Sequence, residues 1–394
     1  MKHRIVALLS ASLCAATGIT YASSAAQTGA SANYPFASYV YVMSNGIAGN
    51  SVAALRRNFF GGLDTAAVVA TGGTGVGVGT TAPPPDPLGS QNSLLLSRDG
   101  QWLFAVNAGS NSITVLDVRR GVPRVVGVFP SGGTYPASLA EHSGSLYVLN
   151  SAGTANVSVF SIARNGYLSA VPDGARSIGS EAPLVGNQPD VGNTAAQLQF
   201  DRTGRWLAVT QKNSAGTGAI DTFSVSADGT LSRAPTVTRS ADPAPFGFTF
   251  DGENHLLVVE AGRAAMSSYA VRKDGSLALL DGSVTNGQTA TCWVDAQLQY
   301  AFAANAGSST ITGYRIGLDG HLRLTRPDGV AASLGNGRAP TDIKLSGDGF
   351  VLFVNEPGTG DVGSFFVTPD GRLVALSTTH LFAPLSGMQG LAVQ

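Results

Sequence analysis

The chain of 394 residues is 43% hydrophobic and 12% charged, and its formal net charge is -1. Because the charges are few and balanced, no strong field of one sign attracts nucleic acid, an anionic membrane surface or a polyanionic substrate. The 50 glycines follow no G-X-Y period, so they indicate many tight turns and short strands. This composition favours an all-β fold.

The N-terminus has the three parts of a secretion signal. Basic residues at positions 2–4 precede an apolar stretch over residues 5–19, and small residues occupy positions 22–26. The apolar stretch is shorter than the roughly 20 residues that a membrane-spanning helix needs. We therefore expect residues 1–26 to be a signal peptide, residues 27–38 a flexible segment and residues 39–394 a domain exported to the periplasm or the extracellular space. No later apolar run is long enough to span a membrane.

Cysteine usage excludes a disulfide scaffold. Cys14 lies in the predicted signal, so Cys292 is the cysteine expected to remain after cleavage. One thiol forms neither an internal disulfide nor a multi-cysteine metal site. The sequence also lacks zinc-ligand spacing, an EF-hand loop, a GxSxG elbow and a dinucleotide fingerprint. We expect no metal and no cofactor.

A segment of similar pattern recurs along the chain, with apolar alternation that ends in Val-x-Asn and is followed by a small-residue turn. Three copies are RDGQWLFAVNAGSNSITVLDV, AQLQYAFAANAGSSTITGYRI and GDGFVLFVNEPGTGDVGSFFV. The residues that close the Val-x-Asn strand in successive copies are Ser44, Asn107, Asn150, Thr210, Glu260, Asn305 and Asn355. They lie between 43 and 63 residues apart, which fits blades of about 40 to 50 residues with loop insertions. The repeat predicts a seven-bladed β-propeller.

Turn residues divide each repeat into four strands. Asp-Gly pairs, such as Asp274-Gly275 and Asp319-Gly320, provide the positive φ angles of a hairpin between the third and fourth strands. The C-terminal sequence GMQGLAVQ matches the innermost strand of a blade. We expect this strand to complete the first blade and close the ring, which removes the exposed edges of an open array of sheets.

The repeats resemble those of the lactonase family of seven-bladed propellers, with its YVTN-type repeats, which includes 6-phosphogluconolactonases and carboxymuconate cyclases. The resemblance covers residues 39–394, and its best-matching pieces are WLFAVNAGSNSITVLDV, TCWVDAQLQYAFAANAGSSTITGYRI and RAPTDIKLSGDGFVLFVNE. It implies a lactone hydrolase or cycloisomerase with His, Arg and Glu side chains around the central channel. The sequence departs from this pattern, because none of its five histidines precedes an innermost strand. We expect the histidines of the turns to be solvated surface residues.

Alternating strand direction predicts where a site forms. Residues just before each innermost strand share one face of the ring with residues at the end of each second strand, and this face is the expected pocket. The candidate catalytic residues are the ionisable side chains expected there, namely Asp342, Glu260, Glu356, Arg338 and Lys212. The candidate ligand-binding residues are the amides and aromatics Asn92, Gln197, Phe246, Trp293 and Gln389.

Each candidate has a structural alternative. Asp342 either faces the channel as a base or caps the strand and its loop. Glu260 replaces the usual Asn, so it is either a strand cap or a buried carboxylate. A buried carboxylate needs hydrogen bonds or a cationic partner, for which Arg263 and Lys212 are the candidates. Trp293 and Phe246 either line a site for a neutral, sugar-like or cyclic ligand or pack between blades. The recurrent Asn residues are expected to bond the loop that follows each strand.

Residues 72–90 form a Gly- and Pro-rich loop between the first two blades. It acts as a partial lid or is a passive insertion, and it is not a phosphate cradle because no GK[ST] follows. Two functions remain open at this stage. One is an exported lactone hydrolase or cycloisomerase acting on a sugar or dicarboxylic lactone. The other is a non-catalytic monomeric scaffold that binds a small ligand or a protein through the same face.

Overall fold

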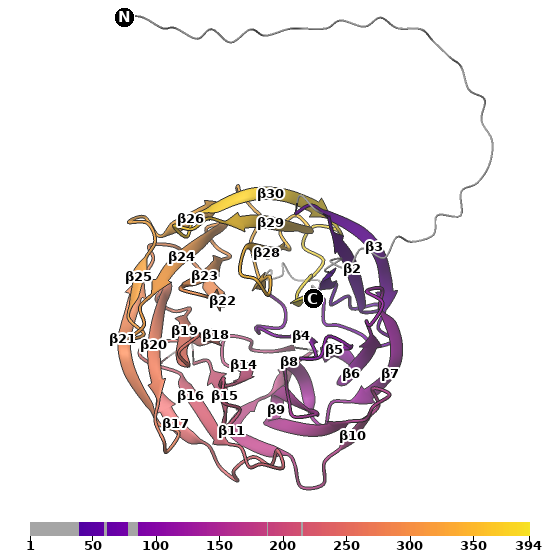
Figure 1. Cartoon of the computed structure of the whole chain (residues 1–394). Helices are drawn as coiled ribbons and strands as arrows, with labels where there is room; N and C mark the ends of the chain where they lie inside the picture. The colour runs from indigo at the N-terminus through magenta and orange to yellow at the C-terminus, as the bar shows by residue number, and fades with distance from the viewer. Residues whose placement is uncertain (1–38, 59–60, 78–85, 187, 214–215) are drawn as a thin grey trace, which may run out of the picture. The chain divides into compact units, whose positions relative to one another are not determined.

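The computed structural model describes residues 39–58, 61–77, 86–186, 188–213 and 216–394. The predicted signal peptide and the segment 27–38 therefore lie outside the described residues. The described residues form seven β-sheets of four or five strands that follow one another around a ring, and Figure 1 shows these blades in chain order. The one helical element among them is a 3-10 turn at Ala108–Ser110. The all-β, seven-bladed fold predicted from the repeat is confirmed.

The first three blades contain the N-terminal strands. The first blade has β1 (Tyr39–Met43), β2 (Ser51–Arg57), β3 (Leu63–Ala70) and the C-terminal β31 (Leu391–Val393). The second has β4 (Leu94–Leu96), β5 (Trp102–Asn107), β6 (Ser112–Asp117) and β7 (Arg124–Pro130). The third has β8 (Thr134–His142), β10 (Leu168–Ala170), β11 (Arg176–Ala182) and the long β9 (Ser145–Ile162), which fills the positions of the second and third strands.

The remaining four blades follow the same meander. The fourth has β14 (Ala195–Phe200), β15 (Trp206–Gln211), β16 (Ala219–Ser224) and β17 (Thr236–Arg239). The fifth has β18 (Pro245–Phe250), β19 (His255–Glu260), β20 (Ala265–Val271) and β21 (Leu277–Thr285). The sixth has β22 (Thr291–Gln297), β23 (Tyr300–Asn305), β24 (Thr310–Ile316), β25 (Leu322–Leu324) and β26 (Val330–Ser333). The seventh has β27 (Ile343–Leu345), β28 (Val351–Glu356), β29 (Asp361–Val367) and β30 (Leu373–His380), and a small hairpin of β12 (Leu184–Val185) and β13 (Gln188–Pro189) lies between the third and fourth blades in the chain.

The C-terminal strand closes the ring, as the sequence predicts. β31 pairs antiparallel with β1, so that Leu391 lies opposite Val42 and Ala392 opposite Tyr41. Leu391 and Met388 are buried in an apolar cluster with residues of the first and seventh blades. The two ends of the domain are therefore joined within one sheet, which leaves no open blade edge at the junction.

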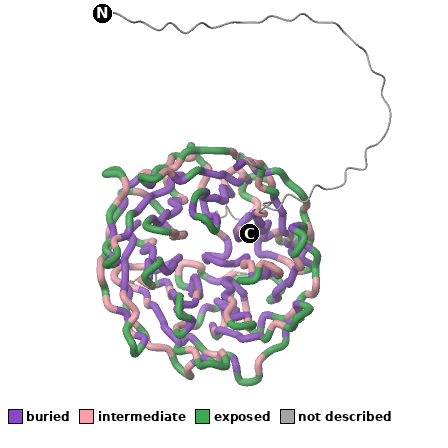
Figure 2. Tube along the Cα trace, viewed as in Figure 1, coloured by how far each residue is buried: buried purple, intermediate pink, exposed green. Residues whose placement is uncertain are grey.

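Burial follows the position of a strand within its blade. Each residue of β5 and β28 is buried, whereas buried or partly buried residues alternate with exposed ones along the outer strand β7. Figure 2 shows the same gradient, with buried segments toward the middle and exposed segments at the periphery. Inner strands are covered on both faces by neighbouring blades and therefore have continuous apolar runs, while outer strands alternate because one face contacts water. No helix of the described residues is long and apolar enough to cross a membrane.

The recurrent asparagines bind the neighbouring blade. In the second blade, Asn107 Oδ1 accepts hydrogen bonds from Thr71 Oγ1 at 2.8 Å and Asn50 Nδ2 at 3.0 Å, both from the region of the first blade. Asn107 Nδ2 donates to Thr114 Oγ1 at 2.9 Å. The expected bond to the loop after the strand is replaced by bonds that join two sheets, because the buried amide has to pair both its donor and its acceptor.

Candidate functional site

Residues 86–92, here called the central segment, lie in the middle of the ring. Its backbone carbonyls accept hydrogen bonds from residues of the third, fourth and sixth blades and from Gln389, just before β31. A chain segment can contact the inner edges of blades on opposite sides of a ring only near the ring axis. Residues 87–92 are buried, and Asp86 is half-buried.

The sequence left open whether the loop 72–90 is a partial lid or a passive insertion, and the position of its last residues bears on this choice. Residues 78–85 of that loop lie outside the described residues. The end of the loop is packed into the propeller: Tyr135 Oη donates to Pro87 O at 2.6 Å, and Ser90 Oγ donates to Ala137 O at 2.8 Å. The Gln91 amide also holds both polar atoms of the Val294 backbone, with Nε2 donating to its carbonyl and Oε1 accepting from its N–H, each at 2.9 Å.

Three side-chain donors converge on two consecutive carbonyl oxygens of the central segment. Trp293 Nε1 and Gln389 Nε2 donate to Ser90 O at 2.9 and 2.8 Å. The Lys212 ammonium donates to Gly89 O. These side chains come from the sixth blade, the closing strand and the fourth blade, and all three are buried. Sequence reasoning placed them on one face, and the structure brings them together.

Lys212 has an apolar and weakly hydrated environment. Its Nζ lies 4.6 Å from the centre of the Phe246 ring, in the geometry of a cation–π contact. Burial lowers the pKa of Lys212 to about 8, and the nearby Asp86 carboxylate opposes the shift. The ammonium is therefore charged at neutral pH and loses its proton slightly above it.

Two carboxyl groups complete the centre. Burial raises the pKa of Asp86 to about 6, against the opposing effects of Lys212 and a hydrogen bond with Gln389. Burial raises the pKa of Asp342 to about 7, and Asp342 Oδ2 accepts the Gly390 N–H at 2.8 Å. The charge of Asp86 adds to the shift of Asp342. Asp342 thus caps the backbone before β31, which is the structural role considered from the sequence.

An aromatic pair forms one wall of this centre. The rings of Phe246 and Trp293 lie 5.2 Å apart at 66°, an edge-to-face contact between the fifth and sixth blades. Both rings are buried, so they pack between blades, as the structural alternative states. Cys292 is the neighbour of Trp293, and burial raises the pKa of its thiol far above the usual range. This thiol is therefore protonated at neutral pH and is a poor nucleophile.

Two predicted ligand amides have other environments. The sequence hypothesis required Gln197 to lie beside Trp293 and Asp342, but its side chain bonds the fifth blade instead. Its Oε1 accepts from Phe248 N at 2.7 Å and its Nε2 donates to Phe248 O at 2.8 Å, which fastens the fourth blade to the fifth. Asn92 adopts a left-handed backbone with φ of 64°. Its backbone carbonyl accepts Leu139 N–H at 2.9 Å.

Glu260 lies in a pocket of hydroxyl groups. Ser240 Oγ contacts both of its carboxyl oxygens at 2.8 and 2.9 Å, and Tyr269 Oη lies 3.3 Å from Oε1. Of the two partners expected for a buried carboxylate, a cation or hydrogen bonds, the structure shows the hydrogen bonds. Arg263 lies 3.7 Å from Asp242 and Lys212 bonds the central segment, so neither cation pairs with Glu260. Burial raises the pKa of Glu260 to about 8, with the Ser240 hydrogen bond opposing the shift.

Glu356 and Arg338 pair with each other at the loop side of the seventh blade. Arg338 Nη1 lies 2.6 Å from Glu356 Oε2 and 2.8 Å from Asp361 Oδ2, and His380 Nδ1 lies 2.8 Å from Asp361 Oδ1. Burial raises the pKa of Glu356, and the Arg338 charge opposes the rise. Arg338 has two acidic partners, so its charge is already engaged in the loop after β28.

Asp86 is the central residue that the sequence analysis missed. It lies in a run of prolines that reads as a surface loop, and its only local signal is a single carboxylate in an apolar sequence, PPPDPLG. Among the described residues, no group of three His, Cys, Asp or Glu side chains lies close enough to hold a metal ion. Three histidines each lie 2.8 Å from an aspartate, His255 from Asp251, His321 from Asp281 and His380 from Asp361, and the His142 ring stacks on Phe200.

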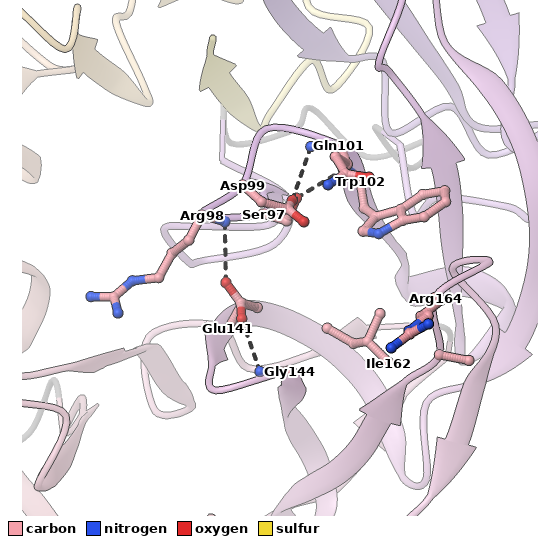
Figure 3. A pocket seen from close by; sticks show the side chains of 10 residues that line it. Ser97, Arg98, Asp99, Gln101, Trp102, Glu141, Gly144, Ile162 and Arg164 are labelled. Carbon is pink, nitrogen blue, oxygen red and sulfur yellow. Dashed lines mark hydrogen bonds between the residues drawn. The ribbon is translucent and has the colours of Figure 1, made fainter.

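A surface pocket of about 480 Å³ lies between the second and third blades, at the turns that join first and second strands. Figure 3 shows Trp102, Ile162 and Arg164 on one side and Glu141 on the other, with the Glu141 carboxylate accepting the backbone N–H groups of Arg98 and Gly144. These turns lie at the opposite ends of the strands from Lys212 and Gln389. The pocket is therefore separate from the centre of the ring.

Comparison with known families places the fold. Residues 206–387, from β15 to the residues just before β31, match the family described as Lactonase, 7-bladed beta-propeller. This part of the ring is similar to the lactonase family. The resemblance seen in the repeats is thereby confirmed, and the first three blades extend the same architecture. No curated protein sequence matches the chain.

Solved structures share the whole ring at low identity. A candidate 6-phosphogluconolactonase from Bacteroides fragilis is 15% identical with a TM-score of 0.66, and the alignment covers 92% of this chain and 99% of that one. The periplasmic gluconolactonase of Pseudomonas aeruginosa is 14% identical with a TM-score of 0.61 over 90% of this chain and 99% of that one. At such identities the likeness concerns the fold.

Proposed function

We propose that this lactonase-family propeller hydrolyses a sugar or dicarboxylic lactone at the centre of its ring. The observation that carries the proposal is the convergence of Lys212, Trp293 and Gln389 on the carbonyl oxygens of Gly89 and Ser90. The Asp342 carboxyl group accepts the N–H of Gly390, the residue after Gln389. Donors that hold a carbonyl oxygen in a buried site are what ester hydrolysis needs, because negative charge develops on that oxygen in the transition state.

The residues present provide the steps of hydrolysis. Ionised Asp342 accepts a proton from water as the water oxygen forms a bond to the lactone carbonyl carbon. The carbonyl oxygen becomes an oxyanion, which the Lys212 ammonium and the Trp293 and Gln389 N–H groups stabilise. The oxyanion then collapses, the bond to the ring oxygen breaks, and protonated Asp342 returns its proton to that oxygen. The product is the open-chain hydroxy acid.

The names of structural relatives agree with this chemistry. One is a candidate 6-phosphogluconolactonase and another a periplasmic gluconolactonase. A neutral sugar lactone is favoured over a phosphorylated one, because Lys212 is the single cation at the described centre and already has Asp86 nearby.

Activity should depend on pH in a bell shape. Asp342, with its pKa of about 7, has to be ionised, so kcat/KM rises as pH increases through 7. Lys212, with its pKa of about 8, has to be protonated, so kcat/KM falls above 8. Replacing Lys212→Met should lower kcat/KM for D-glucono-1,5-lactone about 100-fold, and Asp342→Asn should remove the acidic limb of the profile.

The control is Lys273→Met, which removes an exposed lysine in the turn after β20 and should leave kcat/KM unchanged. Circular dichroism checks that each variant is folded. Equal activity of the Lys212→Met and Lys273→Met variants would contradict a role for Lys212 in hydrolysis.

A non-catalytic scaffold is the second candidate, and one observation favours it. Carbonyl oxygens of the central segment already accept the hydrogen bonds of Lys212, Trp293 and Gln389, so the ring is filled at its axis. A scaffold would bind its partner on the loop face and turn over no lactone. Absence of turnover by folded protein across a panel of sugar and dicarboxylic lactones would favour this candidate.

We further propose that the protein is exported. The support is the order of basic, apolar and small residues over positions 1–26, and one structural relative is a periplasmic enzyme by name. Export predicts a mature N-terminus near residue 23 or residue 27, which N-terminal sequencing of the protein from the periplasmic or culture fraction checks. A full-length chain in the cytoplasm would contradict it.

A further inference from the structure

We propose that the central segment is a displaceable occupant of the lactone site, with the Gly89 and Ser90 carbonyls in the place of the substrate carbonyl. Without substrate, these carbonyls accept hydrogen bonds from the three donors. Residues 86–91 have to move away from the donors before a cyclic ester binds. This inference rests on the proposed function. It adds that the site is self-inhibited and that its ligand is recognised by a carbonyl oxygen.

The burial of the donors requires that something moves. Lys212, Trp293 and Gln389 are 6%, 1% and 0% exposed. No ligand of the size of a sugar lactone reaches side chains that are covered to this extent while the centre keeps its observed arrangement. Either the blades separate or the segment that covers the donors leaves.

The central segment is the part with the weaker attachment. The innermost strands around it are held in regular sheets, such as β22 on β23 and β14 on β15. Residues 86–91 pair with no strand. They are held by the burial of Leu88 in the apolar core, by the backbone bond from Gln91 N to Ala196 O and by side-chain hydrogen bonds, such as that of Tyr135 with Pro87. Release of this segment breaks no strand ladder, whereas opening a blade does.

The segment has a natural hinge. Asn92 O and Ser93 O accept the N–H groups of Leu139 and Val106, at 2.9 and 3.1 Å, so the chain is fixed to two blades at this point. Asn92 has a φ of 64°, which turns the chain sharply between the fixed strand β4 and the central segment. Rotation about this residue moves residues 86–91 without disturbing β4.

The close packing of Gly89 against Lys212 also indicates that the donors form a specific site for a carbonyl group. Gly89 has a φ of 58°, and a Cβ at this position would lie 2.8 Å from Val191 Cβ and 2.9 Å from Lys212 Nζ. The segment thus approaches Lys212 as closely as a residue without a side chain allows. The peptide carbonyl and the carbonyl of a cyclic ester offer the same acceptor to these donors.

Two tyrosines of the third blade provide a matched test. Tyr135 Oη donates to Pro87 O of the central segment. Tyr147 Oη donates to Gly229 O, which lies in the turn after β16 of the fourth blade. Both distances are 2.6 Å. Each Tyr→Phe change removes one hydrogen bond, which corresponds to about a fivefold change in an equilibrium constant. Tyr135→Phe should therefore lower KM for D-glucono-1,5-lactone about fivefold at unchanged kcat, because the open form becomes more populated.

Tyr147→Phe should leave KM unchanged, because its bond does not touch the central segment. Equal KM values for the two variants would overturn the inference. A permanently fixed plug also predicts no KM change, so the comparison separates a displaceable segment from a structural one.

Hydrogen exchange tests the same movement without turnover. Leu88 N donates to Gln389 Oε1 and Gln91 N donates to Ala196 O, so both amides are protected while the segment is in place. Addition of D-glucono-1,5-lactam, which keeps the ring carbonyl and is stable to hydrolysis, should make these two amides exchange at least fivefold faster in the full-length wild-type protein. Unchanged exchange at saturating lactam would overturn the inference. If the wild type hydrolyses no lactone, the proposed function fails, and exchange with the lactam still decides whether the segment is displaced.

Discussion

Asn305 and Glu260 occupy the same position of the repeat in adjacent blades, yet they have different chemistry. Asn305 Oδ1 accepts from Thr291 Oγ1 at 2.6 Å, and its Nδ2 donates to Thr312 Oγ1 at 2.9 Å. Glu260 is equally buried, but its carboxyl group meets the hydroxyls of Ser240 and Tyr269. The amide is a neutral donor and acceptor that matches its environment, whereas the carboxylate adds a charge that the environment does not neutralise.

The difference between Asn305 and Glu260 shows which blades keep the repeat residue and which depart from it. Asn107 and Asn305 keep the repeat residue, and each pairs both its donor and its acceptor, Asn107 with the first blade and its own blade and Asn305 within the sixth blade. The fourth and fifth blades depart from the pattern at Thr210 and Glu260, and these are also the blades that contribute Lys212 and Phe246 to the centre. In these two blades the departures from the repeat accompany the buried ionisable groups Glu260 and Lys212, whose pKa values are shifted by burial.

The largest effect is expected from Glu260→Gln, measured as a change in the pH dependence of stability. The pKa of Glu260 is raised from 4.5 to about 8, so between these values the native state holds a proton that the unfolded state has lost. Stability therefore falls as pH rises from 4.5 to 8, by an amount on the order of 4 kcal/mol for this group. Glu260→Gln should remove this loss and be more stable than the wild type at pH 8, by urea unfolding at a series of pH values.

Asp221→Asn is a matched control for Glu260→Gln. Burial raises the pKa of Asp221 to about 6, so this variant should flatten the stability profile only between about pH 4 and pH 6. A Glu260→Gln profile parallel to that of the wild type up to pH 8 would contradict a protonated Glu260.

A smaller effect of opposite sign is expected from Asn305→Leu. The substitution leaves Thr291, Asn286 and Thr312 without their buried partner, so the free energy of unfolding should fall by about 2–3 kcal/mol at all pH values. Lactone turnover at 25 °C should be unchanged, because Asn305 is not among the central donors. A loss below about 0.5 kcal/mol in urea unfolding would show that the network contributes little.

The ring itself could be predicted from the sequence, and the arrangement of its centre only in part. Repeated turns, alternation and the Val-x-Asn strands indicated seven blades and the closure by residues after Gln389. The same register placed Lys212, Trp293, Gln389 and Asp342 on one face. It did not separate Gln197 and Glu260 from them, because a residue at the end of a strand is able to face the axis or the neighbouring blade, and repeat position alone does not distinguish these two directions.

What the sequence by itself determined is the local, repeated order: strand lengths, turn positions and the number of blades, all of which depend on residues close together in the chain. Only the tertiary structure decided that the end of a proline-rich loop fills the axis and that Asp86 joins the central charges. The physical reason is the separation of the groups involved. Ser90 meets Trp293 across 203 residues and Gln389 across 299 residues, and no local pattern specifies contacts that exist only after the ring has closed.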